Sequence, residues 1–190
     1  MTLVLGLDPG FASVGYALVL LRGSEEVPVS MGVFRTEKSS QKRNVLASDD
    51  NVRRAREISV FLRGLLTEGP HGPVRAICAE TMSFPRSSSV AAKMAMCWGV
   101  VAALSATLDV PILQATPMEL KLRVAGSKTA AKEDVQKALQ ARFGAGVLKK
   151  LCEDVVTSKE EHPYDALGAV VACRDSEVLR FARRMGVAGE

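Results

Sequence analysis

Runs of hydrophobic residues divide the first part of the chain into short extended segments. Met1–Asp8, Gly15–Leu21 and Val27–Thr36 are largely apolar, and Pro9–Gly10 interrupts the pattern after the first of them. The segments are joined by short connections, which are typical of antiparallel strands. We therefore predict a meander of three antiparallel strands over the first 36 residues.

A helical pattern follows the polar stretch 37–50. Apolar residues recur at helical spacing within Val52–Leu66, and the Gly- and Pro-rich stretch 69–73 ends this helix. Val74–Ala79 and Val110–Leu113 predict two further short strands. Ser87–Leu108 lies between them and is apolar on nearly all sides, which predicts a helix covered on more than one face.

The last third of the chain is predicted to be helical. We expect one helix over Ala131–Phe143 and another from His162 to about Arg183, with Pro163 in its first helical position. Three antiparallel strands followed by alternating helices and strands indicate an α/β protein with one mixed five-stranded sheet flanked by helices. The length of 190 residues favours one domain over 1–190.

Composition excludes several broad classes of protein. Hydrophobic residues make up 47% and charged residues 24%, which is ordinary for a globular chain, and 5% aromatics argue against an aromatic platform for stacking bases. The four cysteines form no CxxC motif, which predicts buried free thiols in a reducing compartment. The longest apolar run, Met94–Leu104, is too short to cross a bilayer. With no visible secretory signal, we expect a soluble cytoplasmic protein without a membrane partner.

Basic residues are concentrated in one part of the chain. The net charge is +4, but Met118–Lys150 alone carries eight basic and three acidic residues, for a net +5. This distribution suits a surface that contacts phosphates. A solvated helix face is the alternative, which we prefer for Lys137, Lys149 and Lys150. A second basic stretch either touches DNA or is solvated, and it contains Lys38, Lys42, Arg43, Arg53, Arg54 and Arg56.

Three carboxylates and one histidine lie at the ends of predicted elements. Asp8 ends the first strand, Glu80 ends the fourth, and Asp165 lies in the first turn of the last helix, three residues after His162. Adjacent strand ends open into one crevice in such a sheet, and positions i and i+3 share a helix face. Crowded carboxylates suit Mg²⁺ or Mn²⁺, and two such ions can activate water against a phosphodiester.

Each of these residues also has a purely structural explanation. Asp8 before Pro-Gly is a common turn aspartate, and Glu80 is the first polar residue after a buried strand. Asp165 interacts favourably with the helix dipole without a metal, and His162 is equally explained as an N-cap or surface residue. The shared position of all four at converging element ends is more specific than any one of them.

Several motifs resemble those of RuvC-type Holliday-junction resolvases, in the same order along most of the chain. They are Leu5-Gly-Leu-Asp-Pro-Gly10 with Gly15-Tyr-Ala, Ile77-Cys-Ala-Glu80, the helix up to Gly99, Leu120–Gly126, Lys132–Val135 and His162–Leu167. The resemblance implies a ribonuclease-H-like fold and a homodimer. It also implies metal-dependent cleavage of two opposed strands of a four-way DNA junction with Mg²⁺ or Mn²⁺.

The resemblance also implies roles for individual residues. Asp8, Glu80 and Asp165 match the family's metal-binding acids, and His162 stands at the fourth ligand position, where it binds metal or moves a proton. Phe84 matches an aromatic wedge at the junction centre, although it is equally explained as a small core anchor. The loop 126–132 is one residue longer than the usual pattern, which leaves the equivalence of its lysines open. The DNA-binding candidates are Phe84, Arg86, Lys121, Arg123, Lys128 and Lys132.

Partner and function each have alternatives. The apolar surface of the helix Ser87–Leu108, including Met94, Met96 and Trp98, is covered either by a two-fold partner or by other helices of the chain. Besides a strict Holliday-junction resolvase, the residues fit a broader phage-type nuclease for branched DNA, with or without a branch-migration helicase partner. A junction-binding protein without cleavage and an actin-like ATPase fragment, suggested by Asp8-Pro-Gly10, are less well supported.

Overall fold

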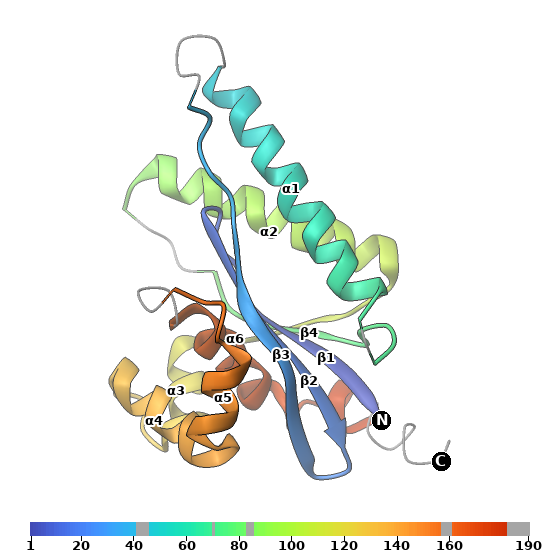
Figure 1. Ribbon diagram of the computed structural model, residues 1–190, viewed down its shortest axis with the longest axis vertical. Coiled ribbons are helices and arrows are strands. Elements are labelled where there is room, and N and C mark those ends of the chain that lie inside the picture. Colours follow the sequence, from blue (N-terminus) through green and yellow to red (C-terminus); the bar gives the residue numbers. More distant parts are fainter. Residues whose placement is uncertain (41–45, 70, 83–85, 157–160, 182–190) are drawn as a thin grey trace.

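The computed structural model describes residues 1–40, 46–69, 71–82, 86–156 and 161–181. Its centre is a five-stranded sheet in the order β3-β2-β1-β4-β5 (Figure 1). The strands β1, β2 and β3 are antiparallel to one another, whereas β4 runs parallel to both β1 and β5. The predicted mixed sheet is therefore confirmed. The strands are β1 (Thr2–Asp8), β2 (Ser13–Arg22), β3 (Glu25–Arg35), β4 (Ile77–Glu80) and β5 (Ile112–Ala115).

Helices cover the sheet in two layers (Figure 1). The pair α1 and α2 packs on one face, and α6 packs on the other together with α3, α4 and α5, of which α5 also contacts β3. The bounds are α1 (Ala47–Thr67), α2 (Ser88–Leu108), α3 (Pro117–Ala125), α4 (Lys132–Phe143), α5 (Ala145–Leu151) and α6 (Glu161–Cys173).

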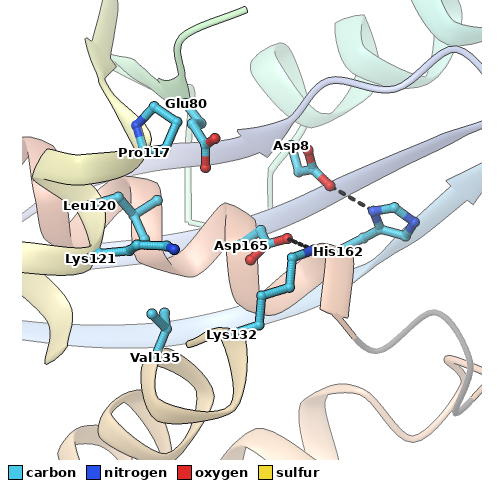
Figure 2. A pocket seen from close by; sticks show the side chains of 9 residues that line it. All are labelled: Asp8, Glu80, Pro117, Leu120, Lys121, Lys132, Val135, His162 and Asp165. Carbon is cyan, nitrogen blue, oxygen red and sulfur yellow. Dashed lines mark hydrogen bonds and ion pairs between the residues drawn. The ribbon is translucent and has the colours of Figure 1, made fainter. Parts of the chain in front are cut away.

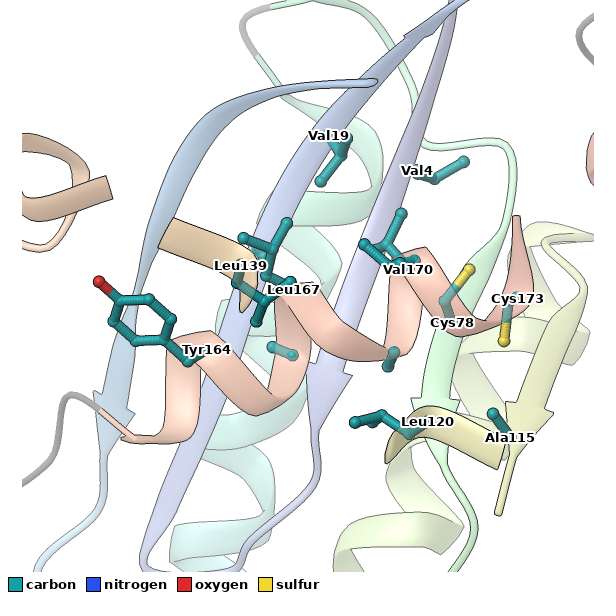
Figure 3. Packing of buried hydrophobic residues seen from close by; sticks show 14 of the residues in the cluster. Val4, Val19, Cys78, Ala115, Leu120, Leu139, Tyr164, Leu167, Val170 and Cys173 are labelled. Carbon is teal, nitrogen blue, oxygen red and sulfur yellow. The ribbon is translucent and has the colours of Figure 1, made fainter. Parts of the chain in front are cut away.

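Alternation along the strands decides which layer each side chain joins. Leu3, Leu5 and Leu7 of β1 pack with α1 and α2, whereas Val4 packs against α6 (Figure 3). Cys78 of β4 also belongs to the α6 side. Even-numbered positions at the ends of β1 and β4 therefore face α6.

Two glycines allow α6 to lie directly on the sheet. A Cβ at Gly6 would stand 2.1 Å from the carbonyl oxygen of Ala166, and a Cβ at Gly15 would stand 2.3 Å from that of His162. No side chain fits in either place without moving the helix. Because Gly6 and Gly15 have no side chains, the N-terminal half of α6 can lie directly against β1 and β2.

Several predicted boundaries are wrong. The first helix begins at Ala47 rather than Val52, because the polar residues Asp49 and Asp50 form its first turn. The fourth strand is Ile77–Glu80 and the fifth is Ile112–Ala115. The helix α6 begins at Glu161, which makes Pro163 its third residue, and it ends at Cys173. A turn over residues 174–176 interrupts the predicted helix before it resumes over residues 177–181.

Two short helices were missed by the sequence analysis. The helix α3 has a capping box in which the Thr116 side chain accepts a hydrogen bond from the Glu119 backbone and the Glu119 carboxylate accepts one from the Thr116 backbone. Thr116-Pro117 with glutamate at 119 is a sequence signal for this start. The helix α5 has only seven residues and no side-chain cap, so its signal is weak.

The prediction that α2 is covered on more than one face is wrong within this chain. Its buried residues are Cys97, Val101 and Leu104, all toward α1 and the sheet. Among the helices of the described residues, α2 is the one that is long and apolar enough to cross a membrane, judged by length and composition alone. All four cysteines are buried and free, as predicted.

Candidate active site

Asp8 and Glu80 leave adjacent strands at the same edge and on the same face of the sheet. The register that pairs Leu7 with Ala79 brings the ends of the parallel strands β1 and β4 together. Both carboxylates follow residues that face α6, namely Gly6 and Cys78, by two positions. The two side chains therefore project toward the helix that carries His162 and Asp165.

These four side chains line one cavity of about 410 Å³ (Figure 2). Asp8 comes from β1, Glu80 from β4, and His162 and Asp165 from α6. The third helix and the start of α4 form the remaining wall, which consists of Pro117, Leu120, Lys121, Lys132 and Val135. The structure thus brings together all four residues that the sequence analysis selected for chemistry, along with two of its DNA-binding candidates.

His162 is hydrogen-bonded to Asp8. Its Nδ1 lies 2.6 Å from Oδ2 of Asp8. Because an ionised carboxylate only accepts hydrogen bonds, Nδ1 carries the proton in this pair. In the neutral ring, Nε2 is then the atom that can accept a hydrogen bond or a proton. The backbone contact between His162 and Gly15 holds the imidazole at this position. Asp8 therefore orients the histidine and selects its tautomer.

Lys132 places a positive charge beside Asp165. Its Nζ lies 3.8 Å from Oδ2 of Asp165 and 3.2 Å from Oε2 of Glu161. The lysine is the first residue of α4, so the start of this helix is tied to the start of α6. The sequence analysis did not select Glu161 as a site residue, although it directly precedes the selected His162 in the sequence.

The cavity is electrostatically crowded. Burial raises the pKa of Glu80, and the negative charges of Asp165 and Asp8 raise it further. Burial also raises the pKa of Asp165 to about 6, and the charge of Asp8 adds to this effect while Lys132 opposes it. These carboxylates therefore repel one another, and the positive charges of Lys121 and Lys132 neutralise them only in part.

The donor set suits a hard divalent cation. Three carboxylates and an imidazole line the cavity, and oxygen ligands of this kind are those that Mg²⁺ and Mn²⁺ prefer. As the side chains stand, no group of three or more such residues in the described part of the chain is arranged to hold a metal ion. Oδ2 of Asp8 is turned toward His162 and Oδ2 of Asp165 toward Lys132, so an ion would be bound either through the other oxygen of each carboxylate or after a change of partner.

The remaining DNA-binding candidates lie elsewhere. Arg123 and Lys128 line a second cavity of about 510 Å³ between β5, α3 and the end of α6, and Arg123 pairs with Asp175 at 3.3 Å. Arg86 is exposed two residues before α2. Phe84 lies outside the described residues, so its role as a wedge stays a prediction.

One residue of the second basic stretch is structural. Arg54 is 3% exposed, donates from Nε to the Thr36 hydroxyl at 2.9 Å, and stacks over the Phe11 ring. Its buried position excludes the DNA contact considered for it. Lys42 and Arg43 lie outside the described residues.

Comparison with known proteins identifies a family model and several relatives that match this chain. Residues 4–144 match the sequence model of the family described as crossover junction endodeoxyribonuclease RuvC. The RuvC protein of Moorella thermoacetica is 32% identical over 142 residues, covering 75% of this chain and 78% of that protein. The RuvC protein of Natranaerobius thermophilus is 27% identical over 184 residues, covering 96% and 99%.

Solved structures show the same fold. T. thermophilus RuvC in complex with Holliday junction substrate superposes with a TM-score of 0.71 at 24% identity, covering 98% of this chain and 97% of that one. The yeast mitochondrial Holliday junction resolvase superposes with a TM-score of 0.66 at 16% identity, covering 100% and 85%. At these identities the likeness shows the fold alone. That fold is the mixed sheet flanked by helices that is found in ribonuclease-H-like resolvases.

Proposed function

The chain belongs to the RuvC family of crossover junction endodeoxyribonucleases, and we propose that it resolves four-way DNA junctions by hydrolysing phosphodiesters on two opposed strands. Endonuclease activity on Holliday junctions follows from the family. The observation that supports the location of the reaction is the cavity in which Asp8, Glu80 and Asp165 converge from three separate elements. The family assignment favours this function over the actin-like ATPase and over a junction-binding protein without cleavage.

Asp8, Glu80 and Asp165 are the residues that would hold divalent metal ions. Burial and, after it, the charges of neighbouring carboxylates raise the pKa values of Glu80 and Asp165, and a cation would relieve the repulsion between these carboxylates. When bound, two Mg²⁺ ions, or Mn²⁺ in their place, would neutralise charge on the scissile phosphate and acidify a water molecule.

His162 moves the proton in this proposal. Its hydrogen bond to Asp8 keeps the proton on Nδ1, so Nε2 accepts a proton from the attacking water or, once protonated, donates it to the leaving oxygen. The water oxygen bonds to phosphorus as the bond to the leaving oxygen breaks. A second role of His162, as a metal ligand, remains the alternative for this side chain.

Lys121 and Lys132 hold the phosphate in place. Both line the cavity, and their charges partly oppose the rise that burial, Asp165 and Asp8 cause in the pKa of Glu80. Lys132 is paired with Asp165 and Glu161, and it is positioned to transfer from a carboxylate to a phosphate oxygen when DNA and metal enter. Arg86, Arg123 and Lys128 are proposed to contact the junction arms farther from the reacting bond.

The exposed side of α2 is the proposed dimer surface. Small residues recur there at helical spacing, including Ala92, Ala95, Gly99 and Ala102, and all are exposed. A second copy of the chain would cover this apolar surface and place two active sites on opposed strands. Sedimentation of the wild type should show a dimer, and Ala95→Glu should shift it to a monomer, whereas the control Ala141→Glu on the exposed side of α4 should not. A monomeric wild type, or one that partitions to vesicles, would overturn this proposal.

We propose a cytoplasmic protein that acts on DNA, with or without a branch-migration helicase. Strict selectivity for four-way junctions and a broader activity on branched DNA are distinguished by substrate. We would incubate the protein with a four-way junction, a three-way junction and a linear duplex of matching sequence, each with one labelled strand, in Mg²⁺ and in EDTA. Paired symmetric nicks in the four-way junction, absent in EDTA, are expected. Equal cutting of the linear duplex would contradict the resolvase assignment.

A further inference from the structure

Two buried cysteines lie in contact behind the active site. Cys78 is in the middle of β4, and Cys173 is the last residue of α6. Their thiols are hydrogen-bonded to each other, and both belong to the core between the sheet and α6 (Figure 3). Ala166, Val170 and Cys173 share the helix face that lies on the sheet, so the close approach allowed at Gly6 extends toward β4.

Of these two thiols, Cys173 alone borders one of the two cavities described above. Cys173 lines the second cavity of about 510 Å³ between β5, α3 and the end of α6, together with Glu119, Arg123, Lys128 and Asp175. Cys78 is fully buried beneath it and lines neither of the two cavities described above. A reagent as small as hydrogen peroxide therefore has a route to the sulfur of Cys173, with Cys78 as the next sulfur behind it.

The other two cysteines lack this arrangement. Burial raises the pKa of Cys97 to about 12, which disfavours the reactive thiolate. Cys152 is 5% exposed and lines neither cavity. The hydrogen bond from Cys78, in contrast, lowers the pKa of Cys173.

We propose that Cys173 is a site of oxidation by hydroperoxides and that Cys78 converts the oxidised form into an internal disulfide. The Cys173 sulfur attacks one peroxide oxygen, the O–O bond breaks, and the other oxygen leaves as water after taking up a proton. The resulting sulfenic acid is attacked by the sulfur of Cys78, the S–O bond breaks, and a second water leaves. Overall, the two thiols lose two protons and two electrons, and the peroxide is reduced to two water molecules.

The bond would join the two elements that carry Glu80 and Asp165. An S–S bond of about 2.05 Å is much shorter than a contact between thiols. The end of α6 and the middle of β4 must therefore move closer to each other when the bond forms. The contact itself does not depend on metal or DNA. The chemistry can therefore be tested separately from the nuclease activity.

Mass spectrometry of the oxidised protein tests the proposal. The reduced wild type is treated with hydrogen peroxide, blocked with N-ethylmaleimide under denaturing conditions, and digested. We expect one linked peptide pair containing Cys78 and Cys173, lighter by two hydrogens than the reduced pair and restored by dithiothreitol. Cys97 and Cys152 should be alkylated as in the untreated protein. A disulfide involving Cys152, a bond between two chains, or unmodified Cys173 would overturn the proposal.

Single variants separate the two steps. In Cys78→Ser, Cys173 should stop at the sulfenic acid, which dimedone traps. In Cys173→Ser, Cys78 should remain a thiol, while Cys97→Ser should form the disulfide as the wild type does. Circular dichroism checks that each variant is folded. If a variant is unfolded, the peptide map of the oxidised wild type alone decides whether Cys78 and Cys173 form the disulfide. Dimedone labelling of Cys78 rather than Cys173 would contradict the assigned order.

Discussion

Replacing Asp165 with asparagine should stabilise the metal-free protein at neutral pH. The pKa of Asp165 is raised from 3.8 to about 6, chiefly by burial and by the charge of Asp8. A shift of this size corresponds to at most about 3 kcal/mol of destabilisation by the ionised form. Because 30% of the side chain is exposed, we expect Asp165→Asn to raise the free energy of unfolding by about 1–2 kcal/mol at pH 8. The lost pairing with Lys132 offsets little of this gain, because the lysine side chain is 67% exposed and its Nζ lies 3.8 Å from Oδ2 of Asp165.

The free energy of unfolding that Asp165→Asn gains over the wild type should decrease as the pH falls. The folded wild type takes up a proton on Asp165 near pH 6, whereas the unfolded chain does so near 3.8, so the folded state binds more protons between these values. Wild-type stability from this group therefore rises as the pH falls from about 7 to 4. The advantage of Asp165→Asn should be full above pH 7 and should shrink as the pH approaches 4.

Urea unfolding without divalent cations measures this effect. Wild type, Asp165→Asn and the control Asp175→Asn, which alters a half-buried carboxylate outside the active-site cavity, are compared at pH 8 and pH 5. A stabilised Asp165 variant with a smaller gain at pH 5 supports the electrostatic argument. If Asp165→Asn is less stable than the wild type at pH 8, or if its gain is independent of pH, the argument is refuted.

Three further predictions follow from the same site. Gly6→Ala should lower the free energy of unfolding by about 1–3 kcal/mol in urea, because its Cβ meets the Ala166 carbonyl, whereas Gly146→Ala, with open space around it, should cost little. Mg²⁺ or Mn²⁺ should raise the Tm of the wild type through binding to the folded state, and equal shifts in Asp8→Asn would count against the ligand assignment. Lys132→Met should weaken junction binding at every sequence and reduce the salt slope of the association constant by about 1; an unchanged slope would exclude a phosphate contact.

The sheet could be predicted because its signals are local. Continuous apolar runs, the first of them ended by Pro9–Gly10, define the strands, and β1 to β3 are found close to their predicted bounds. Asp8 and Glu80 could be predicted as neighbours because each ends a strand, and strand order in such folds brings these ends together. The convergence of His162 and Asp165 on them followed from the family resemblance and from helix spacing.

Features that depend on distant contacts could not be predicted. The helix α6 stops at Cys173, and the next residue, Arg174, pairs with the buried Glu26 of β3 at 3.1 Å. Arg54 looks like a surface charge in the sequence, yet it is buried against Phe11 and Thr36. The pairing of Lys132 with Asp165 and Glu161 likewise joins residues about thirty positions apart. Sequence periodicity contains no information about such partners.

The most direct test of the account compares junction cleavage by carboxylate variants. Wild type, Asp8→Asn, Glu80→Gln, Asp165→Asn and the control Asp175→Asn are incubated with a labelled four-way junction in Mg²⁺, after circular dichroism and junction binding have shown that each is folded. We expect paired symmetric nicks from the wild type and the control, and none above background from the three cavity variants. Cleavage at the wild-type rate by any of those three would contradict the assignment of this cavity as the active site.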